Sequence, residues 1–275
     1  MLMSPQDKTK KVKGVVCYCH GYGDQCGYTK RAALYKLVEA GYVVAAMDYE
    51  GHGRSDGELV LVEDWSVLIG DVVDYFGAVK EDRGGEEKFF LMGESMGGAV
   101  CFDGWNAAPD LFDGGCVMVA PMVKIADEMK PPQFVVEGMR KMLELLPWMG
   151  RWCLTPSGDL SNLAFKDKAK LKIAENTPAL YGRVPRLATG REMVGVTERI
   201  EKQLGDFAAP FLVCHGEADK VTSPEMSKML YDTSCSGDKS LKMYKGMWHT
   251  LLTGEPDENI EQVLGDVIEW LDMRT

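Results

Sequence analysis

The chain has 275 residues, a net charge of −11 and a hydrophobic content of 45%. This length suffices for one large domain or two small ones, and it can bury a core without disulfide staples. The acidic balance argues against a nucleic-acid partner, because phosphate binding needs clustered lysine and arginine. It also disfavours electrostatic attachment to anionic lipid.

The eight cysteines are placed like buried apolar residues rather than like a disulfide framework. Half of them lie inside apolar runs, and none belongs to a C-x-x-C pair. This usage favours a reducing compartment. The sequence has neither a charged-then-apolar leader nor an apolar run of about 18 residues. We therefore expect a cytoplasmic protein that contacts membranes only peripherally.

Short apolar runs recur along the chain and are typical of strands buried on both faces of a parallel sheet. Helical periodicities separate them, with apolar residues at three- and four-residue steps from Trp65 to Phe76 and again from Ile260 to Leu271. The runs cover residues 15–19, 43–47, 89–92, 116–120, 211–214 and 241–244. This alternation predicts an α/β fold with a mostly parallel, doubly wound sheet.

The alternation stops after Pro121 and resumes at Phe211. The intervening residues carry helical patterns without a strand-like run. One helix face there gathers Val135, Met139, Met142, Leu143 and Leu146, at the spacing of an amphipathic helix. We predict a core made of residues 1–121 and 196–275 and a helical cap made of residues 122–195. The apolar face packs on the core, borders a substrate pocket, or does both.

The motif Gly93-Glu94-Ser95-Met96-Gly97 follows one strand pattern and opens a helical one. That context is what a nucleophile elbow requires, whereas the motif alone also occurs in unrelated proteins. The turn is sharp, so its flanking positions must be small, and Gly93 and Gly97 meet that need. Ser95 is the candidate nucleophile, placed near a helix N-terminus that favours developing negative charge.

A serine hydroxyl needs a base to take its proton, and the chain offers four histidines. In this type of fold the partners follow in the order serine, acid, histidine. His249 satisfies that order, because it lies in a loop between the last strand pattern and the last helix pattern. His20 and His52 precede the serine in Gly-rich turns. His20 and His215 are expected to hydrogen-bond backbone groups at their turns.

Asp219 is the preferred acid. It follows the strand pattern at residues 211–214 by a short turn, which places it at the carboxyl edge of the sheet beside the serine. Its task would be to hold the imidazole in the correct tautomer and to stabilise the imidazolium. Glu217 is the rival candidate. Asp238 and Asp257 are expected at the surface or at a helix cap.

An oxyanion hole is expected where His20-Gly21-Tyr22-Gly23 follows the first strand pattern. Glycines let the backbone present N–H groups to a tetrahedral oxyanion. The predicted donors are the backbone N–H groups of Tyr22 and Met96. A second Gly-rich segment, residues 51–57, is interpreted as a tight loop at the sheet edge, because no P-loop lysine or dinucleotide spacing follows it.

Several segments in combination resemble the monoacylglycerol lipase family of α/β-hydrolases, above all the plant-type branch that includes caffeoylshikimate esterase. The resemblance runs from about Val12 to Leu271 and rests on residues 20–23, 51–57, 93–98, 215–219 and 239–249, supported by 170–174 and 254–259. It implies an α/β-hydrolase fold with the cap inserted after the sixth strand. It also implies that Ser95, Asp219 and His249 form a triad under a cap that admits an acyl or hydroxycinnamoyl chain.

Two departures from that family's pattern matter. The family opens with a strand hairpin, but only the mostly polar residues 1–13 precede the first strand pattern here, so the hairpin is missing or shortened. Animal members also carry an acid and an arginine after H-G-x-G that hold the glycerol head. Asp24 matches the acid, whereas Tyr28 stands in place of the arginine. The predicted substrate contacts are Asp24 and Tyr28, joined by Met142 and Leu146 from the cap.

The favoured function is hydrolysis of carboxylic esters through an acyl-enzyme, with monoacylglycerols releasing fatty acid and glycerol as first substrates. The alternatives are a hydroxycinnamoyl ester such as caffeoyl shikimate, a lysophospholipid, or acyl transfer to an alcohol. A ligand-binding receptor on the same fold is the alternative without turnover. No cofactor or metal is implied. The partners expected are the ester substrate and a membrane or lipid droplet touched by the cap.

Overall fold

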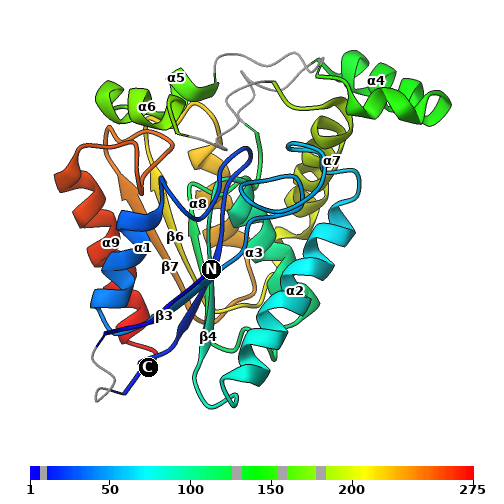
Figure 1. Ribbon diagram of the computed structural model, residues 1–275. Helices are drawn as coiled ribbons and strands as arrows, with labels where there is room; N and C mark the ends of the chain where they lie inside the picture. The colour runs from blue at the N-terminus through cyan, green and yellow to red at the C-terminus, as the bar shows by residue number, and fades with distance from the viewer. Residues whose placement is uncertain (7–10, 126–131, 154–159, 178–183) are drawn as a thin grey trace.

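The computed structural model describes residues 1–6, 11–125, 132–153, 160–177 and 184–275. These residues form one sheet of seven strands in the order β1-β3-β2-β4-β5-β6-β7 (Figure 1). The strands are β1 Leu2–Met3, β2 Val15–Cys19, β3 Val43–Ala46, β4 Phe89–Glu94, β5 Gly115–Val119, β6 Phe211–Gly216 and β7 Lys239–Tyr244. All neighbours pair in parallel except β1, which is antiparallel to β3. The predicted mostly parallel sheet is confirmed.

The N-terminal segment contributes a single short strand. Leu2 pairs with Ala45 and Met3 with Val44, and β1 has only these two residues. The described N-terminal residues thus provide one strand of the expected hairpin. The cap segment follows β5, which is the fifth strand among the described residues and would be the sixth with both strands of the hairpin.

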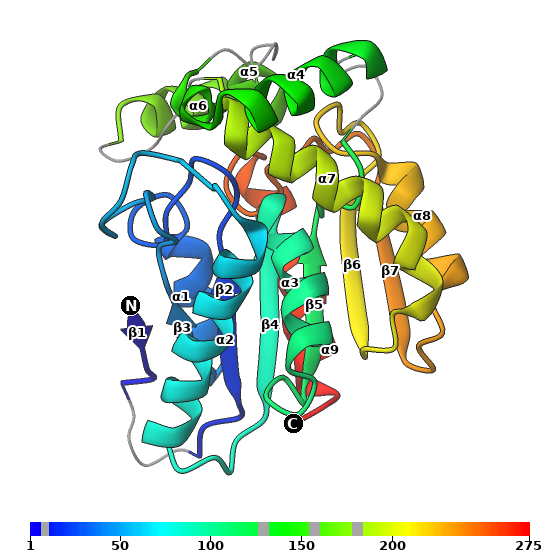
Figure 2. The ribbon, with the colours of Figure 1, turned by 90° about the vertical axis from the view of Figure 1, so that its right-hand side faces the viewer.

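Helices cover both faces of the sheet, as Figures 1 and 2 show. One face carries α1 Arg31–Glu39 and α9 Asp257–Asp272, and the other carries α2 Trp65–Asp82, α3 Met96–Ala107 and α8 Pro224–Thr233. Each face has its own cluster of buried side chains. Successive residues of β2 alternate between them, since Cys17 joins the cluster beneath α2 and α3, whereas Val16 and Tyr18 join the cluster beneath α1 and α9. Apolar runs without polar alternation thus mark strands that are buried on both sides.

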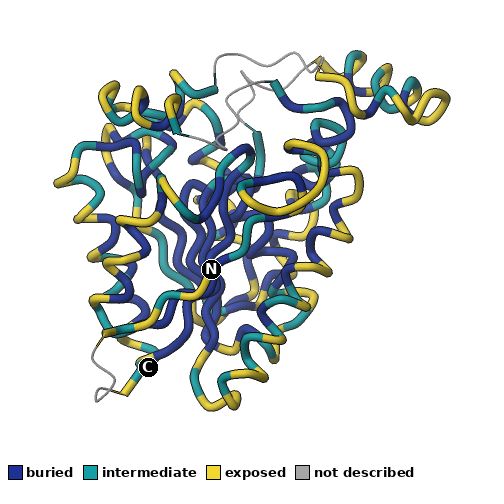
Figure 3. Tube along the Cα trace, viewed as in Figure 1, coloured by how far each residue is buried: buried dark blue, intermediate teal, exposed yellow. Residues whose placement is uncertain are grey.

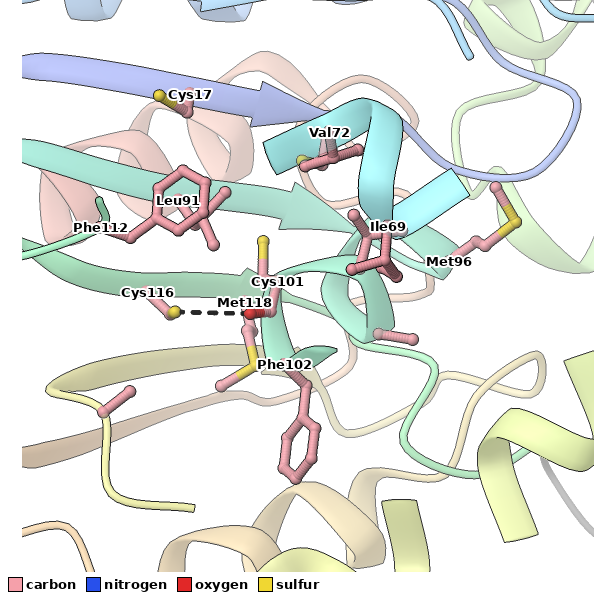
Figure 4. Packing of buried hydrophobic residues seen from close by; sticks show 14 of the residues in the cluster. Cys17, Ile69, Val72, Leu91, Met96, Cys101, Phe102, Phe112, Cys116 and Met118 are labelled. Atoms are coloured by element: carbon pink, nitrogen blue, oxygen red, sulfur yellow. Dashed lines mark hydrogen bonds between the residues drawn. The ribbon is translucent and has the colours of Figure 1, made fainter. Parts of the chain in front are cut away.

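The cluster beneath α2 and α3 contains several of the cysteines (Figure 4). Cys17, Cys101 and Cys116 are fully buried there among aromatic and aliphatic side chains, and Figure 3 shows the central strands as a dark-blue, buried interior. No disulfide joins any of the eight cysteines, all of which lie among the described residues. Burial raises the pKa of the Cys17, Cys101 and Cys116 thiols, so these residues act as small apolar side chains.

Between β5 and β6 the chain forms α4 Gln133–Leu145, η1 Pro147–Arg151, α5 Leu160–Ala164, α6 Lys168–Glu175, α7 Leu187–Gln203 and η2 Leu204–Asp206. The helices α4, α5 and α6 lie across the carboxyl end of the sheet, and α7 runs down from them along α3 (Figure 2). The predicted boundary at residue 195 falls inside α7. Val196 and Ile200, beyond it, belong to the core cluster, so the division into core and cap stays a prediction.

Among the described residues, no helix has the length and apolar character needed to cross a membrane.

Candidate active site

Ser95 occupies the sharp turn between β4 and α3. Its backbone has φ 59° and ψ −120°, a conformation that a side-chain-bearing residue adopts only under constraint, at a cost of about 1–3 kcal/mol. The constraint comes from both sides, because the Ser95 N–H donates to Val119 O at 3.0 Å and its carbonyl accepts from the Met122 N–H at 2.9 Å. The sheet therefore fixes the direction in which the hydroxyl points.

The glycines of the motif are required by close backbone approach. A Cβ on Gly93 would lie 2.2 Å from the carbonyl oxygen of Gly97, and a Cβ on Gly97 would lie 2.0 Å from that of Cys19. A Cβ on Gly98 would meet Pro121 at 2.4 Å. These separations are far below van der Waals contact, so the start of α3 can pack against the sheet only with glycine at these places.

His249 and Asp219 complete a continuous line of hydrogen bonds with Ser95. His249 Nε2 lies 2.9 Å from Ser95 Oγ, and its Nδ1 lies 2.7 Å from Asp219 Oδ2. Asp219 follows β6 and His249 follows β7, so three strand ends of one sheet edge supply the three groups. Since a carboxylate only accepts, Nδ1 carries the proton and Nε2 offers its lone pair to the serine hydroxyl.

Asp219 is held by four further bonds. Its Oδ2 accepts from His215 Nε2 at 3.0 Å and from Thr222 Oγ1 at 2.9 Å. Its Oδ1 accepts the N–H groups of Val221 at 2.7 Å and of Thr222 at 3.2 Å. Both oxygens thus accept at least two hydrogen bonds, and the carboxylate is fixed toward His249. Glu217, the rival acid, is exposed to solvent, and its place beside the imidazole is taken by Asp219.

The pKa values of the two groups move in opposite directions. Burial alone would raise the pKa of Asp219, but His249 and His215 more than reverse this and hold it below its ordinary value. Burial alone would lower the pKa of His249, but the neighbouring Asp219 carboxylate raises it above its ordinary value. The site is therefore arranged to favour a carboxylate beside an imidazole that accepts a proton readily.

One expectation about the other histidines is wrong. His215 does not bond backbone, because its Nδ1 accepts from Ser227 Oγ at 2.7 Å while Nε2 donates to Asp219. The side chain fits there because β6 carries it beneath α8, which contributes Ser227. His20 bonds backbone as predicted, with Gly21 O at 2.8 Å from Nδ1 and the Tyr49 N–H at 3.1 Å from Nε2.

The predicted oxyanion loop lies beside the serine. A Cβ on Gly21 would be 3.9 Å from Ser95 Oγ, which places residues 20–23 next to the nucleophile turn. Met96 is the first residue of α3, so its N–H is one of the helix's unpaired first donors. The two loops adjoin at this point, and the assignment of the Tyr22 and Met96 N–H groups as donors stays a prediction.

Asp24 is tied into a buried ion cluster that the sequence interpretation missed. It accepts from Thr29 Oγ1 at 2.9 Å and lies 3.2 Å from Lys30 Nζ. Lys30 also bonds the Glu94 carboxylate and Thr253 Oγ1, the latter at 3.0 Å. The acidic residue inside the nucleophile motif was the available signal, since a buried carboxylate requires a partner.

The segment after Asp24 is not helical. Residues 26–30 form turns, and α1 begins only at Arg31. Tyr28 is exposed on these turns. The cation near Asp24 comes from Lys30 and points inward, so it cannot offer an alcohol the donors that an exposed arginine would. Substrate contacts by Asp24 and Tyr28 stay predictions.

Of the predicted cap contacts, Met142 is half-buried in α4, whereas Leu146 follows the end of the helix and is 42% exposed. The other end of the cap is tied to the histidine loop. The Thr250 N–H donates to Ala164 O at 3.1 Å, and the N–H groups of Lys166 and Asp167 donate to Gly254 O at 3.0 and 2.8 Å. The cap and the loop that carries His249 are thus directly joined.

A separate open pocket of about 670 Å³ lies between α2, α3, α4 and α7. Its charged side chains are largely paired with one another; for example, Arg199 forms a two-pronged bond with Asp103, which also accepts from Trp65 Nε1 at 2.7 Å. Within the described ranges, no group of three or more His, Cys, Asp or Glu side chains is arranged to hold a metal ion.

The chain is similar to several known proteins. A family model described as "Serine aminopeptidase, S33" matches residues 10–257. A caffeoylshikimate esterase of Arabidopsis thaliana is 36% identical over 95% of this chain and 78% of its own length. A monoglyceride lipase of Homo sapiens is 28% identical over 96% of this chain and 84% of its own. The crystal structure of a Paleococcus ferrophilus monoacylglycerol lipase matches with a TM-score of 0.82 at 25% identity, covering 100% of this chain and 98% of that one.

Proposed function

This chain belongs to the serine aminopeptidase S33 family of α/β-hydrolases, and on that premise we propose that it hydrolyses carboxylic esters with Ser95 as nucleophile, His249 as general base and Asp219 as the orienting acid. The observation that carries the proposal is the unbroken hydrogen-bond line from Ser95 Oγ through both His249 nitrogens to Asp219. Two relatives that cover 95% and 96% of the chain are named as a caffeoylshikimate esterase and a monoglyceride lipase.

The reaction follows from this line. His249 Nε2 takes the proton from Ser95 Oγ as the oxygen attacks the ester carbonyl, and Asp219 stabilises the imidazolium that forms. The N–H groups of Tyr22 and Met96 stabilise the oxyanion. The imidazolium then returns its proton to the leaving alcohol, which frees an acyl-enzyme. Water, deprotonated by the same imidazole, releases the acid and restores Ser95.

Monoacylglycerols are the proposed first substrates, ahead of caffeoyl shikimate by a modest margin. A long acyl chain offers about 0.8 kcal/mol per buried CH₂, which is more than a small polar alcohol supplies. The alcohol side has Asp24 engaged by Lys30 and a phenol at Tyr28, so glycerol is recognised without an exposed arginine. A lysophospholipid, or an alcohol acceptor in place of water, uses the same chemistry.

The hydroxycinnamoyl ester is the second candidate because of one specific observation. The curated relative at 36% identity is named as a caffeoylshikimate esterase, whereas the human monoglyceride lipase is at 28%. The planar acyl group of such an ester is shorter than a fatty acyl chain, so it would depend less on the cap. The two candidates therefore predict different responses to changes in the cap.

The cap is also the proposed contact with a membrane or lipid droplet. After Met142, the cap exposes four large apolar side chains near the end of α4 and around η1. They are Leu145, Leu146, Trp148 and Trp152. Tryptophan at a lipid surface keeps its ring in the apolar layer and its N–H in water. We propose that this surface admits the acyl chain from the lipid phase.

The decisive experiment is kcat/KM on purified protein for a monoacylglycerol, a lysophospholipid and caffeoyl shikimate, with Ser95→Ala as the blank. The proposal expects the monoacylglycerol to be first. A caffeoyl shikimate value tenfold above it would move the assignment to phenolic esters. Absence of turnover on all three and on a simple aryl ester would favour a ligand-binding role.

A further inference from the structure

Three acidic and basic side chains are buried together directly beneath the nucleophile turn. The side chains of Lys30 and Glu94 are 2% and 3% exposed, and that of Asp24 is 14% exposed. Burial alone would lower the pKa of Lys30, but Glu94 and Asp24 raise it above its ordinary value. Lys30 is therefore a permanent cation held between two carboxylates.

The partners of this ammonium come from three loops that each carry part of the site. Asp24 stands two residues after the predicted oxyanion donor Tyr22. Glu94 directly precedes Ser95. Thr253, whose Oγ1 lies 3.0 Å from Lys30 Nζ, stands four residues after His249. One nitrogen thus joins the oxyanion loop, the nucleophile turn and the histidine loop.

Glu94 strengthens the same connection with its second oxygen. Its Oε1 accepts the Leu252 N–H at 3.1 Å, so the residue before the nucleophile is bonded both to Lys30 and to the backbone of the histidine loop. Replacing a buried ion pair by apolar residues of similar volume is often neutral or stabilising. A gain in stability alone therefore does not account for these charges at this place.

We propose that Lys30 and Glu94 are positioning residues that hold the oxyanion loop, the nucleophile turn and the histidine loop in mutual alignment. This inference rests on the proposed ester hydrolysis at Ser95. The pair also acts electrostatically on the base, because the charged groups that influence His249 are Asp219, Glu94 and Lys30. Glu94 raises the pKa of His249 and Lys30 lowers it, so their effects oppose each other.

The test is a double-mutant cycle with Lys30→Met, Glu94→Gln and the combined variant. We expect each variant to lower kcat/KM at its optimum by about 10²-fold, since small misplacements of reacting groups have effects of that size. Lys30→Met should move the acid limb of the pH profile to higher pH, and Glu94→Gln should move it to lower pH. The combined variant should restore the limb but not kcat/KM.

Lys36→Met is the matched control, because Lys36 lies on the adjoining helix α1 with its side chain 54% exposed and should leave rate and profile unchanged. The combined variant leaves neither Lys30 nor Glu94 as an unpaired buried charge, so it tests the proposal even if a single variant fails to fold. Wild-type rate and pH profile in either single variant, or wild-type kcat/KM in the combined one, would overturn it.

The rate at which a fluorophosphonate labels Ser95 separates this inference from the proposed function. A wild-type protein that neither hydrolyses esters nor reacts with the probe would refute the function itself. A wild-type protein that does both, beside a Lys30→Met variant with the same labelling rate, would refute only the positioning role.

Discussion

The loops that carry Ser95, Asp219 and His249 differ from the α4–η1 part of the cap in how firmly their side chains are held. Asp219 alone accepts five hydrogen bonds from buried or partly buried donors. Leu146 and Trp148, in contrast, are exposed apolar side chains at the end of α4 and in η1. The two regions lie at the same end of the sheet, but hydrogen bonds between buried polar groups hold the first, whereas the second presents exposed apolar side chains.

This difference suggests that the loops determine the rate of the chemical step and that the cap determines which ester is preferred. Ser95 is held by backbone hydrogen bonds and Asp219 and His249 by charged ones, so a small displacement there should affect every ester alike. The cap surface binds substrate through buried apolar area, not through precisely placed polar groups. Its contribution to binding free energy should therefore grow with the length of the acyl chain. Substitutions in the loops that carry Ser95, Asp219 and His249 should therefore lower the rate strongly for every ester. Substitutions in the cap should have smaller effects that depend on the substrate.

The largest effect is expected for Ser95→Ala. Removing the nucleophile should lower kcat on any ester by roughly 10⁵- to 10⁶-fold, because members of such a unit act together. Steady-state rates on an aryl acetate and on a monoacylglycerol should fall equally. A variant that keeps a tenth of the wild-type rate on either substrate would mean that another group attacks.

Asp219→Asn should lower kcat by on the order of 10⁴-fold, because the amide can bond the imidazole in the wrong tautomer and cannot stabilise its charge. Glu217→Gln is the matched control, since Glu217 lies two residues away and is exposed. Its rate should equal that of the wild type. If Glu217→Gln lost activity while Asp219→Asn kept the wild-type rate, the acid would be Glu217.

The pH profile should show a smaller, graded effect. His249 must be neutral to accept the proton, and Asp219 raises its pKa. Activity should thus be low where the imidazole is charged. kcat/KM should rise with pH, and the midpoint of this rise should lie above the ordinary imidazole pKa of about 6.5. A midpoint below that value on a slowly reacting ester would contradict the described surroundings of His249.

The cap variant Met142→Ser/Leu146→Ser should have the smallest effect on chemistry and the strongest dependence on substrate. We expect kcat/KM for long-chain monoacylglycerols to fall by at least tenfold and that for acetyl esters to change little, because less apolar area is buried. Phe134 is an exposed apolar residue at the start of α4, so Phe134→Ser provides a comparison variant at the opposite end of that helix. Equal losses on both esters would show that the face is structural.

The same contrast explains what the sequence could predict. Glycine spacing around Ser95 has a local steric cause, and strand-end acids and histidines follow chain order, so both could be inferred. The role of Lys30 could not, because two of its partners, Glu94 and Thr253, lie 64 and 223 residues away and no periodic pattern marks such a contact. His215 was misassigned for a similar reason, since its partner Ser227 lies on the next helix.

The most direct test of the central claim is the site of a fluorophosphonate adduct. After brief exposure of the wild-type protein, peptide mass spectrometry should find one modified residue, Ser95, and prior acylation by a slowly hydrolysed ester should block the labelling. Ser95→Ala should carry no adduct although it is folded. An adduct on a different residue, or equal modification of the Ser95→Ala variant, would contradict the assignment of the nucleophile.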